Sequence, residues 1–149
     1  MDKHASNILA KAGSDLFALK TLRNHGLDSI ALSQVCRATL IAKLAYASPA
    51  WRSFCSVSDL SRLESVEQKA RRWGFYSNQA STITDILNQA DKGLFQKFLQ
   101  KSDHVLHPML PPIKATVYCM RTRGQNGQLS TKSGLTSQNF IIRMLYSSI

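Results

Sequence analysis

The sequence predicts a mainly α-helical protein: a small helical bundle, then a proline-containing linker and an irregular, basic C-terminal extension. Three observations support this fold class. Apolar residues recur at intervals of three and four along the first two thirds of the chain, which is the spacing of one helix face. Capping residues and Gly or Pro stops separate these periodic stretches. Pro108, Pro111 and Pro112 then precede a tail rich in Gly, Ser and Thr, so we expect a helical domain at 1–103 and an extension at 104–149.

Two helices are expected in the first third of the chain. The first spans about residues 3–23, with Gly26 as its C-cap. Its apolar stripe consists of Ile8, Ala12, Leu16, Leu19 and Leu22. The second begins at Asp28 or Ser29 and is stopped by Pro49. Its apolar residues cover most of its circumference, which predicts a central position; they are Leu32, Val35, Cys36, Leu40, Ile41 and Leu44.

Two further helices follow. The third starts at Ser56 or Ser58 and ends at Gly74. Its stripe consists of Leu60, Leu63, Val66, Ala70 and Trp73. The fourth starts at a capping box formed by Thr82 and Asp85. Its stripe consists of Ile83, Ile86, Leu87, Ala90, Leu94 and Phe98.

The rest of the chain is less regular. Gly93 lowers helix propensity by about 1 kcal/mol relative to Ala and allows a break in the fourth helix. Residues 104–112 should be extended, because residues that precede proline avoid the helical region. A short amphipathic element is expected from Asn139 to Tyr146.

Composition narrows the class of protein. The 149 residues include 19 Lys and Arg against 9 Asp and Glu, for a formal net charge of +10, which favours polyanionic partners. Three dispersed cysteines argue against a secreted disulfide framework and favour a reducing, intracellular compartment. No apolar run approaches the length of a membrane span, so we expect no membrane association.

The third predicted helix carries the clearest binding signal. Glu67 and Arg71 are spaced to pair, whereas Arg62, Lys69 and Arg72 share a flank with no acid at matching spacing. Trp73 directly follows these cations; an exposed indole there could stack on a base, although its place on the apolar stripe favours the core.

The tail after Asp103 contains no acidic residue. Nucleic-acid contact and disorder are equally compatible with this composition. The predicted nucleic-acid-binding residues of the whole chain are Arg62, Lys69, Arg72, Arg121, Arg123, Lys132 and Arg143.

Enzymatic signals are weak. No two acidic residues are adjacent and we expect the acids on solvent-facing helix positions, so no two-metal site, cofactor or catalytic residue is predicted. Cys55 and Cys119 would be nucleophiles only beside a histidine, and are expected to be incidental thiols. His104 and His107 have a spacing that zinc can use, but no full ligand set is evident.

One segment resembles a known family. The stretch Tyr46–Trp51 reads Tyr-Ala-Ser-Pro-Ala-Trp, and it resembles the Tyr-Ala-Ser-Pro-x-Trp segment downstream of the polymerase core in reverse transcriptases of non-LTR (LINE-type) retrotransposons. Segments along nearly the whole chain resemble the same region in the same order: residues 16–23, 26–27, 62–72, 90–91, 94–95, 104–107, 110–112, 121–123 and 139–143.

The resemblance implies a helical thumb and C-terminal extension that grip an RNA or DNA template–primer duplex. It also implies that the palm and fingers of the parent polymerase are missing partners. The family's Tyr-x-Asp-Asp box, palm and finger motifs and endonuclease have no counterpart here, so the chain alone should not polymerise DNA. Met120 stands where the family has an aliphatic residue, and the start at Met1 suggests a truncated copy or gene-model fragment.

Two alternatives stay open. One is a helical protein-interaction module, whose basic charge only keeps it soluble. The other is an independent zinc hydrolase that uses His104 and His107.

Overall fold

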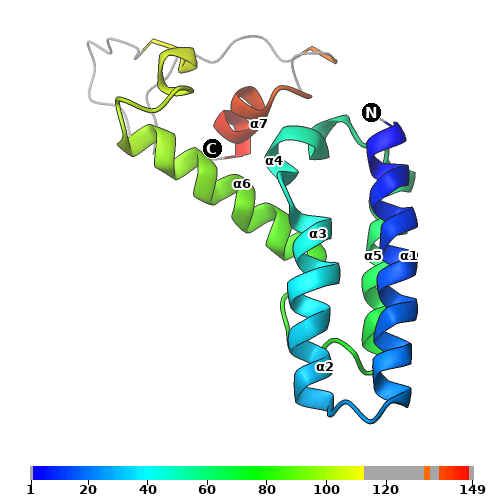
Figure 1. Ribbon diagram of the computed structural model, residues 1–149. Coiled ribbons are helices and arrows are strands. Elements are labelled where there is room, and N and C mark those ends of the chain that lie inside the picture. The colour runs from blue at the N-terminus through cyan, green and yellow to red at the C-terminus, as the bar shows by residue number, and fades with distance from the viewer. Residues whose placement is uncertain (1, 113–132, 135–137, 148–149) are drawn as a thin grey trace. The chain divides into compact units, whose positions relative to one another are not determined.

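The computed structural model of the chain describes residues 2–112, 133–134 and 138–147, with side chains from residue 6 onward (Figure 1). It confirms the mainly α-helical fold class, since the described residues form helices and contain no strand. The chain divides into two compact units, Met1–Gln89 and Ala90–Ile149, which we name the first unit and the second unit.

The first unit is built around α1 (Asp2–Asn24). A second helical segment returns alongside it and consists of α2 (Ser29–Cys36), the π-helical turn η1 (Arg37–Ile41) and α3 (Ala42–Ala45). α5 (Val57–Arg72) also packs against α1 (Figure 1). α1 therefore contacts both of the other long segments of this unit.

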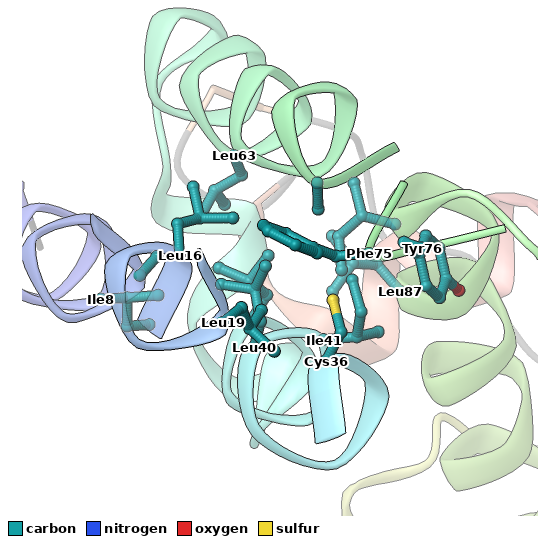
Figure 2. Packing of buried hydrophobic residues seen from close by; sticks show 14 of the residues in the cluster. Ile8, Leu16, Leu19, Cys36, Leu40, Ile41, Leu63, Phe75, Tyr76 and Leu87 are labelled. Carbon is teal, nitrogen blue, oxygen red and sulfur yellow. The ribbon is translucent and has the colours of Figure 1, made fainter. Parts of the chain in front are cut away.

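The core of the first unit is formed mainly by the apolar stripes expected from the sequence, although Leu22 of the first stripe is exposed. Figure 2 shows side chains of α1, the α2–η1 segment and α5 meeting between the helices. Each large apolar side chain buried in this way stabilises the fold by about 1.5–3 kcal/mol. The most deeply buried apolar side chains include Leu19, Leu40, Leu44, Leu63 and Phe75.

Helix boundaries in the first unit coincide with capping residues. The Asp28 side chain accepts backbone N–H groups at the start of α2, and Ser56 accepts one at the start of α5. Gly26 follows α1 with φ +87°, and Gly74 follows α5 with φ +74°. Glycine adopts this left-handed conformation without a steric cost, so both helices end where the sequence indicates.

The second predicted helix ends earlier than expected. It stops at Ala45, and Ala47 takes a left-handed conformation with φ +50°. Pro49 lies in the first turn of a new short helix, α4 (Ser48–Trp51), where a missing N–H costs no helical hydrogen bond. The 3-10 turn η2 (Arg52–Phe54) continues it. Pro49 thus starts a helix and does not end one.

The next helix, α6 (Ile83–Gln100), begins in the first unit and ends in the second. Its capping box is confirmed, since Thr82 Oγ1 accepts the N–H of Asp85 at 3.1 Å. The helix runs through Gly93 without the break that the sequence allows.

The second unit has a core of its own. The short amphipathic element expected near the C-terminus is the helix α7 (Phe140–Ser147), whose first turn is capped by Asn139. Residues 104–112 are not extended throughout, because turns lead into the 3-10 helix η3 (His107–Met109). The domain boundary expected after residue 103 lies inside this unit. The buried residues of its core are Phe95, Phe98, Ile141, Met144 and Leu145.

Candidate nucleic-acid interface

Lys69 and Arg72, two of the predicted phosphate-binding residues, are exposed in the last turns of α5. They lie three residues apart, about 4.5 Å along the helix axis, and so share one flank. Within residues 6–112, neither side chain forms an ion pair. Both charges are therefore available to phosphate groups.

Arg62, the third predicted residue of this flank, has a nearby acid. Its side chain is 59% exposed, and its Nη1 lies 3.7 Å from Oδ1 of Asp59. The expectation that no acid is spaced to meet Arg62 is wrong, because residues three apart are neighbours on a helix. Asp59 is buried and opposes part of this charge, while the exposed guanidinium of Arg62 stays accessible to a phosphate.

Two of the three acids of α5 are buried, and the third, Glu64, is exposed. The expected pair of Glu67 and Arg71 is confirmed, with Arg71 Nη2 2.6 Å from Glu67 Oε1. Glu67 Oε2 also accepts the backbone N–H of Ile83 at 2.7 Å. The expectation of solvent-facing acids is wrong for Glu67, Asp59 and Asp91, which are all buried. Because the Glu67 carboxylate is buried and already paired with Arg71, it does not neutralise the basic flank.

Trp73 is not a core residue, contrary to the interpretation favoured by its place on the stripe. It is the C-cap of α5, and 42% of it is exposed. Its indole meets the ring of the buried Phe75 edge to face, with centroids 6.1 Å apart. The flank therefore ends in an accessible aromatic side chain next to Arg72.

Sequence reasoning missed the contribution of α1 to this surface. Lys20 and Arg23 are exposed in its last two turns, and Arg23 Nη1 donates to the carbonyl oxygen of Trp73 at 2.8 Å. Basic residues before a helix-ending glycine are visible in the sequence. Only the packing of α1 on α5 shows that the two helices end side by side.

The remaining predicted contacts lie in the tail. Arg121, Arg123 and Lys132 fall outside the described residues, and their role stays a prediction. Arg143 is described: its Nη2 lies 3.1 Å from Oδ2 of the buried Asp91. Its charge is thus already opposed by a carboxylate within the second unit.

Features for other chemistries are sparse in the described part of the chain. There, no three His, Cys, Asp or Glu residues gather as a metal site requires, and no helix is long and apolar enough to cross a bilayer. His104 uses Nδ1 to accept the N–H of Leu106 at 3.1 Å. Cys55 is half-buried, and Cys119 lies outside the described residues.

A groove of about 610 Å³ separates α1 from the η1–α3 segment. It contains the ion pair of Lys43 with Asp15, whose Nζ to Oδ2 distance is 2.6 Å. The exposed ring of Tyr46 lies at its edge. Lys11 also lines this groove and is exposed, so one cation remains there beside the pair, whereas the α5 flank carries both Lys69 and Arg72.

The chemistry that these residues support is binding. Exposed cations can neutralise phosphates, and an exposed indole can stack on a base. Comparison with protein-family models gives no match, and no curated protein or solved structure compared with the chain is significantly similar to it.

Proposed function

We propose that this protein binds nucleic acid through the phosphate backbone without reading its sequence. The observation that carries the proposal is the flank of α5, where Lys69 and Arg72 are exposed and neither is paired within residues 6–112. Arg62 extends it by about 10 Å along the axis. The net charge of +10 adds long-range attraction for a polyanion.

We further propose that the chain corresponds to the thumb and C-terminal extension of a non-LTR retrotransposon reverse transcriptase. This proposal rests on the resemblance around Tyr46–Trp51 and on the flanking segments. The helical fold is compatible with it. In that setting the basic flank holds a template–primer duplex, and the catalytic groups belong to the missing palm. Sequencing the DNA upstream of the Met1 codon tests it: a palm-encoding frame supports the assignment, and a continuous upstream frame that encodes an unrelated domain contradicts it.

A salt titration tests the binding. The full chain is titrated with a blunt, fluorescently labelled DNA duplex at several salt concentrations. The logarithm of the binding constant should fall linearly with the logarithm of salt, by about 0.9 per phosphate contact. The Lys69→Gln/Arg72→Gln variant should flatten the slope by about 2. A wild-type titration without a slope contradicts the proposal.

A matched variant separates local contacts from net charge. Lys92 and Lys97 are exposed on α6, and Lys92→Gln/Lys97→Gln removes the same charge. This variant should keep a steeper slope than the α5 variant. Equal slopes would mean that overall charge, and not the α5 flank, determines binding.

The rival function is docking of a protein partner, and one observation favours it. Tyr46, Phe54 and Val57 are exposed by 76%, 44% and 83%, within one short segment around α4. This function predicts that Lys69→Glu/Arg72→Glu leaves activity intact, whereas Val57→Asp abolishes association with a partner helix or a second copy. Sedimentation velocity of the wild type and Val57→Asp distinguishes the two functions.

A further inference from the structure

The two tryptophans of the chain have opposite environments. Trp51 is 4% exposed, and its Nε1 donates to the carbonyl oxygen of Tyr46 at 2.8 Å. Trp73 is 42% exposed and lies at the C-terminal end of α5. Trp51 is therefore a core residue that packing accounts for. Trp73 is not, because much of its indole is exposed to solvent.

The Trp73 indole is held in place although it is exposed. Arg23 fixes its backbone carbonyl from α1, and the same guanidinium lies 4.8 Å from the ring centroid of Phe75. Phe75 is fully buried and meets the indole edge to face, at an interplanar angle of 78°. A ring positioned in this way loses little conformational freedom when a ligand stacks on it.

The surroundings of this indole are positively charged. The last two turns of α1 and α5 carry the exposed cations Lys20, Arg23, Lys69 and Arg72. The acid among these turns, Glu67, is buried and paired with Arg71. An apolar protein surface would gain nothing from this field, whereas a ligand that combines phosphates with an aromatic ring matches both features.

We propose that Trp73 stacks on an unpaired nucleobase of a strand whose phosphates contact Lys69 and Arg72. This inference rests on the proposed nucleic-acid binding. It adds that the protein prefers nucleic acid with unpaired bases. The protein should favour single-stranded overhangs and junctions, where unpaired bases are accessible, over a blunt, fully paired duplex. A base within a duplex already stacks on its neighbours and cannot offer its face to Trp73.

Fluorescence and affinity measurements on the full chain test the inference. The probes are a blunt DNA duplex, the same duplex with a single-stranded overhang, and the RNA forms of both. The overhang should quench tryptophan emission and bind about 5- to 100-fold more tightly than the blunt duplex. Trp73→Ala should remove both effects, while Trp73→Phe should keep most of the affinity preference. Trp51→Phe, with Trp73 intact, should keep the quenching.

The outcomes separate this inference from the function on which it rests. If both duplexes bind with steep salt dependence but Trp73→Ala leaves the preference unchanged, the stacking inference is overturned and backbone binding stands. If neither duplex binds the wild type, the proposed function fails as well. Circular dichroism of Trp73→Ala checks that the variant is folded. A preference confined to the DNA or the RNA probes identifies which nucleic acid supplies the base.

Discussion

At the scale of single residues, Arg71 shows that some cations of α5 stabilise the fold while others stay exposed to solvent. Its Nε donates to Glu67 at 2.7 Å, and its Nη2 donates to the carbonyl oxygen of Ala80 at 2.8 Å. Its guanidinium also lies 4.8 Å from the ring centroid of Tyr76. Arg71 therefore ties the loop after α5 back onto the helix, while the adjacent Arg72 is exposed.

Replacing these neighbouring arginines should have very different consequences. Arg71→Ala leaves the buried Glu67 carboxylate without its cation, and should lower the free energy of unfolding by about 3–5 kcal/mol. Arg72→Ala is the matched control and should change it by no more than about 0.5 kcal/mol. Urea denaturation followed by circular dichroism measures both. Similar losses in the two variants would contradict this division of roles.

Cys36 makes stability depend on alkaline pH. Its burial, and then the negative charge of Asp15, raise the pKa of the thiol from 9.0 to about 11. Because the folded pKa lies above the unfolded one, the contribution is complete below pH 9 and is lost as the pH rises toward 11. The loss should reach about 1–3 kcal/mol.

The comparison that isolates this effect is wild type against Cys36→Ala. The variant should be less stable at neutral pH because of the cavity it leaves. Its stability should fall less between pH 9 and 11, as measured by urea denaturation at each pH. The pKa of Tyr76 is also raised, mainly by burial, and Cys36 is the smallest of the causes that act on it, so most of the Tyr76 effect is common to both proteins. Parallel curves would show that Cys36 does not contribute.

At the scale of secondary-structure elements, the connection between α3 and α4 depends on Ala47. A left-handed conformation costs an L-residue about 1–2 kcal/mol, and glycine avoids that cost. Ala47→Gly should therefore raise the free energy of unfolding by about 0.5–1 kcal/mol, after the larger entropy of glycine in the unfolded chain is subtracted. Ala45→Gly, within α3, should lower it by about 1 kcal/mol. Thermal unfolding of the two variants measures both effects. A loss of stability in both would contradict the left-handed conformation of Ala47.

The sequence predicted helix ends and ion pairs correctly where a single interaction between near neighbours in the chain determines them. Asp28 and Ser56 cap helices because their side chains reach backbone N–H groups within three residues. Glu67 and Arg71 meet because they are one turn apart. Such contacts depend on sequence neighbours alone, so spacing is enough to find them.

The predictions were wrong or incomplete where the position of a residue depends on how its helix ends or on another helix. Periodicity placed Trp73 on the buried stripe, but α5 ends at Arg72, so this stripe does not extend through the cap. Pro49 was expected to end a helix and instead begins one, because the chain had already turned at Ala47. The meeting of Arg23 with the end of α5 is a tertiary contact between residues 50 positions apart, which spacing cannot reveal.

At the scale of the whole molecule, the excess of positive charge is divided between two roles. In the described part of the chain, the acids of the closest ion pairs are at most 19% exposed: Asp15 with Lys43, Glu67 with Arg71, and Asp91 with Arg143. These pairs stabilise the units and hold their cations away from a ligand. The cations that remain on the surface supply the attraction for phosphate, so the position of a charge matters more than the total.

Arg143 and Lys69 provide the sharpest test of this division, since each loses one positive charge when changed to Gln. Arg143→Gln leaves the buried Asp91 without this cation, and should lower the free energy of unfolding by about 3 kcal/mol. As long as the protein is folded, its salt slope should equal that of the wild type. Lys69→Gln should leave stability within about 0.5 kcal/mol and flatten the slope by about 0.9. If Arg143→Gln instead flattens the slope as Lys69→Gln does, Arg143 contacts phosphate as the sequence predicts, and its ion pair with Asp91 opens when nucleic acid binds.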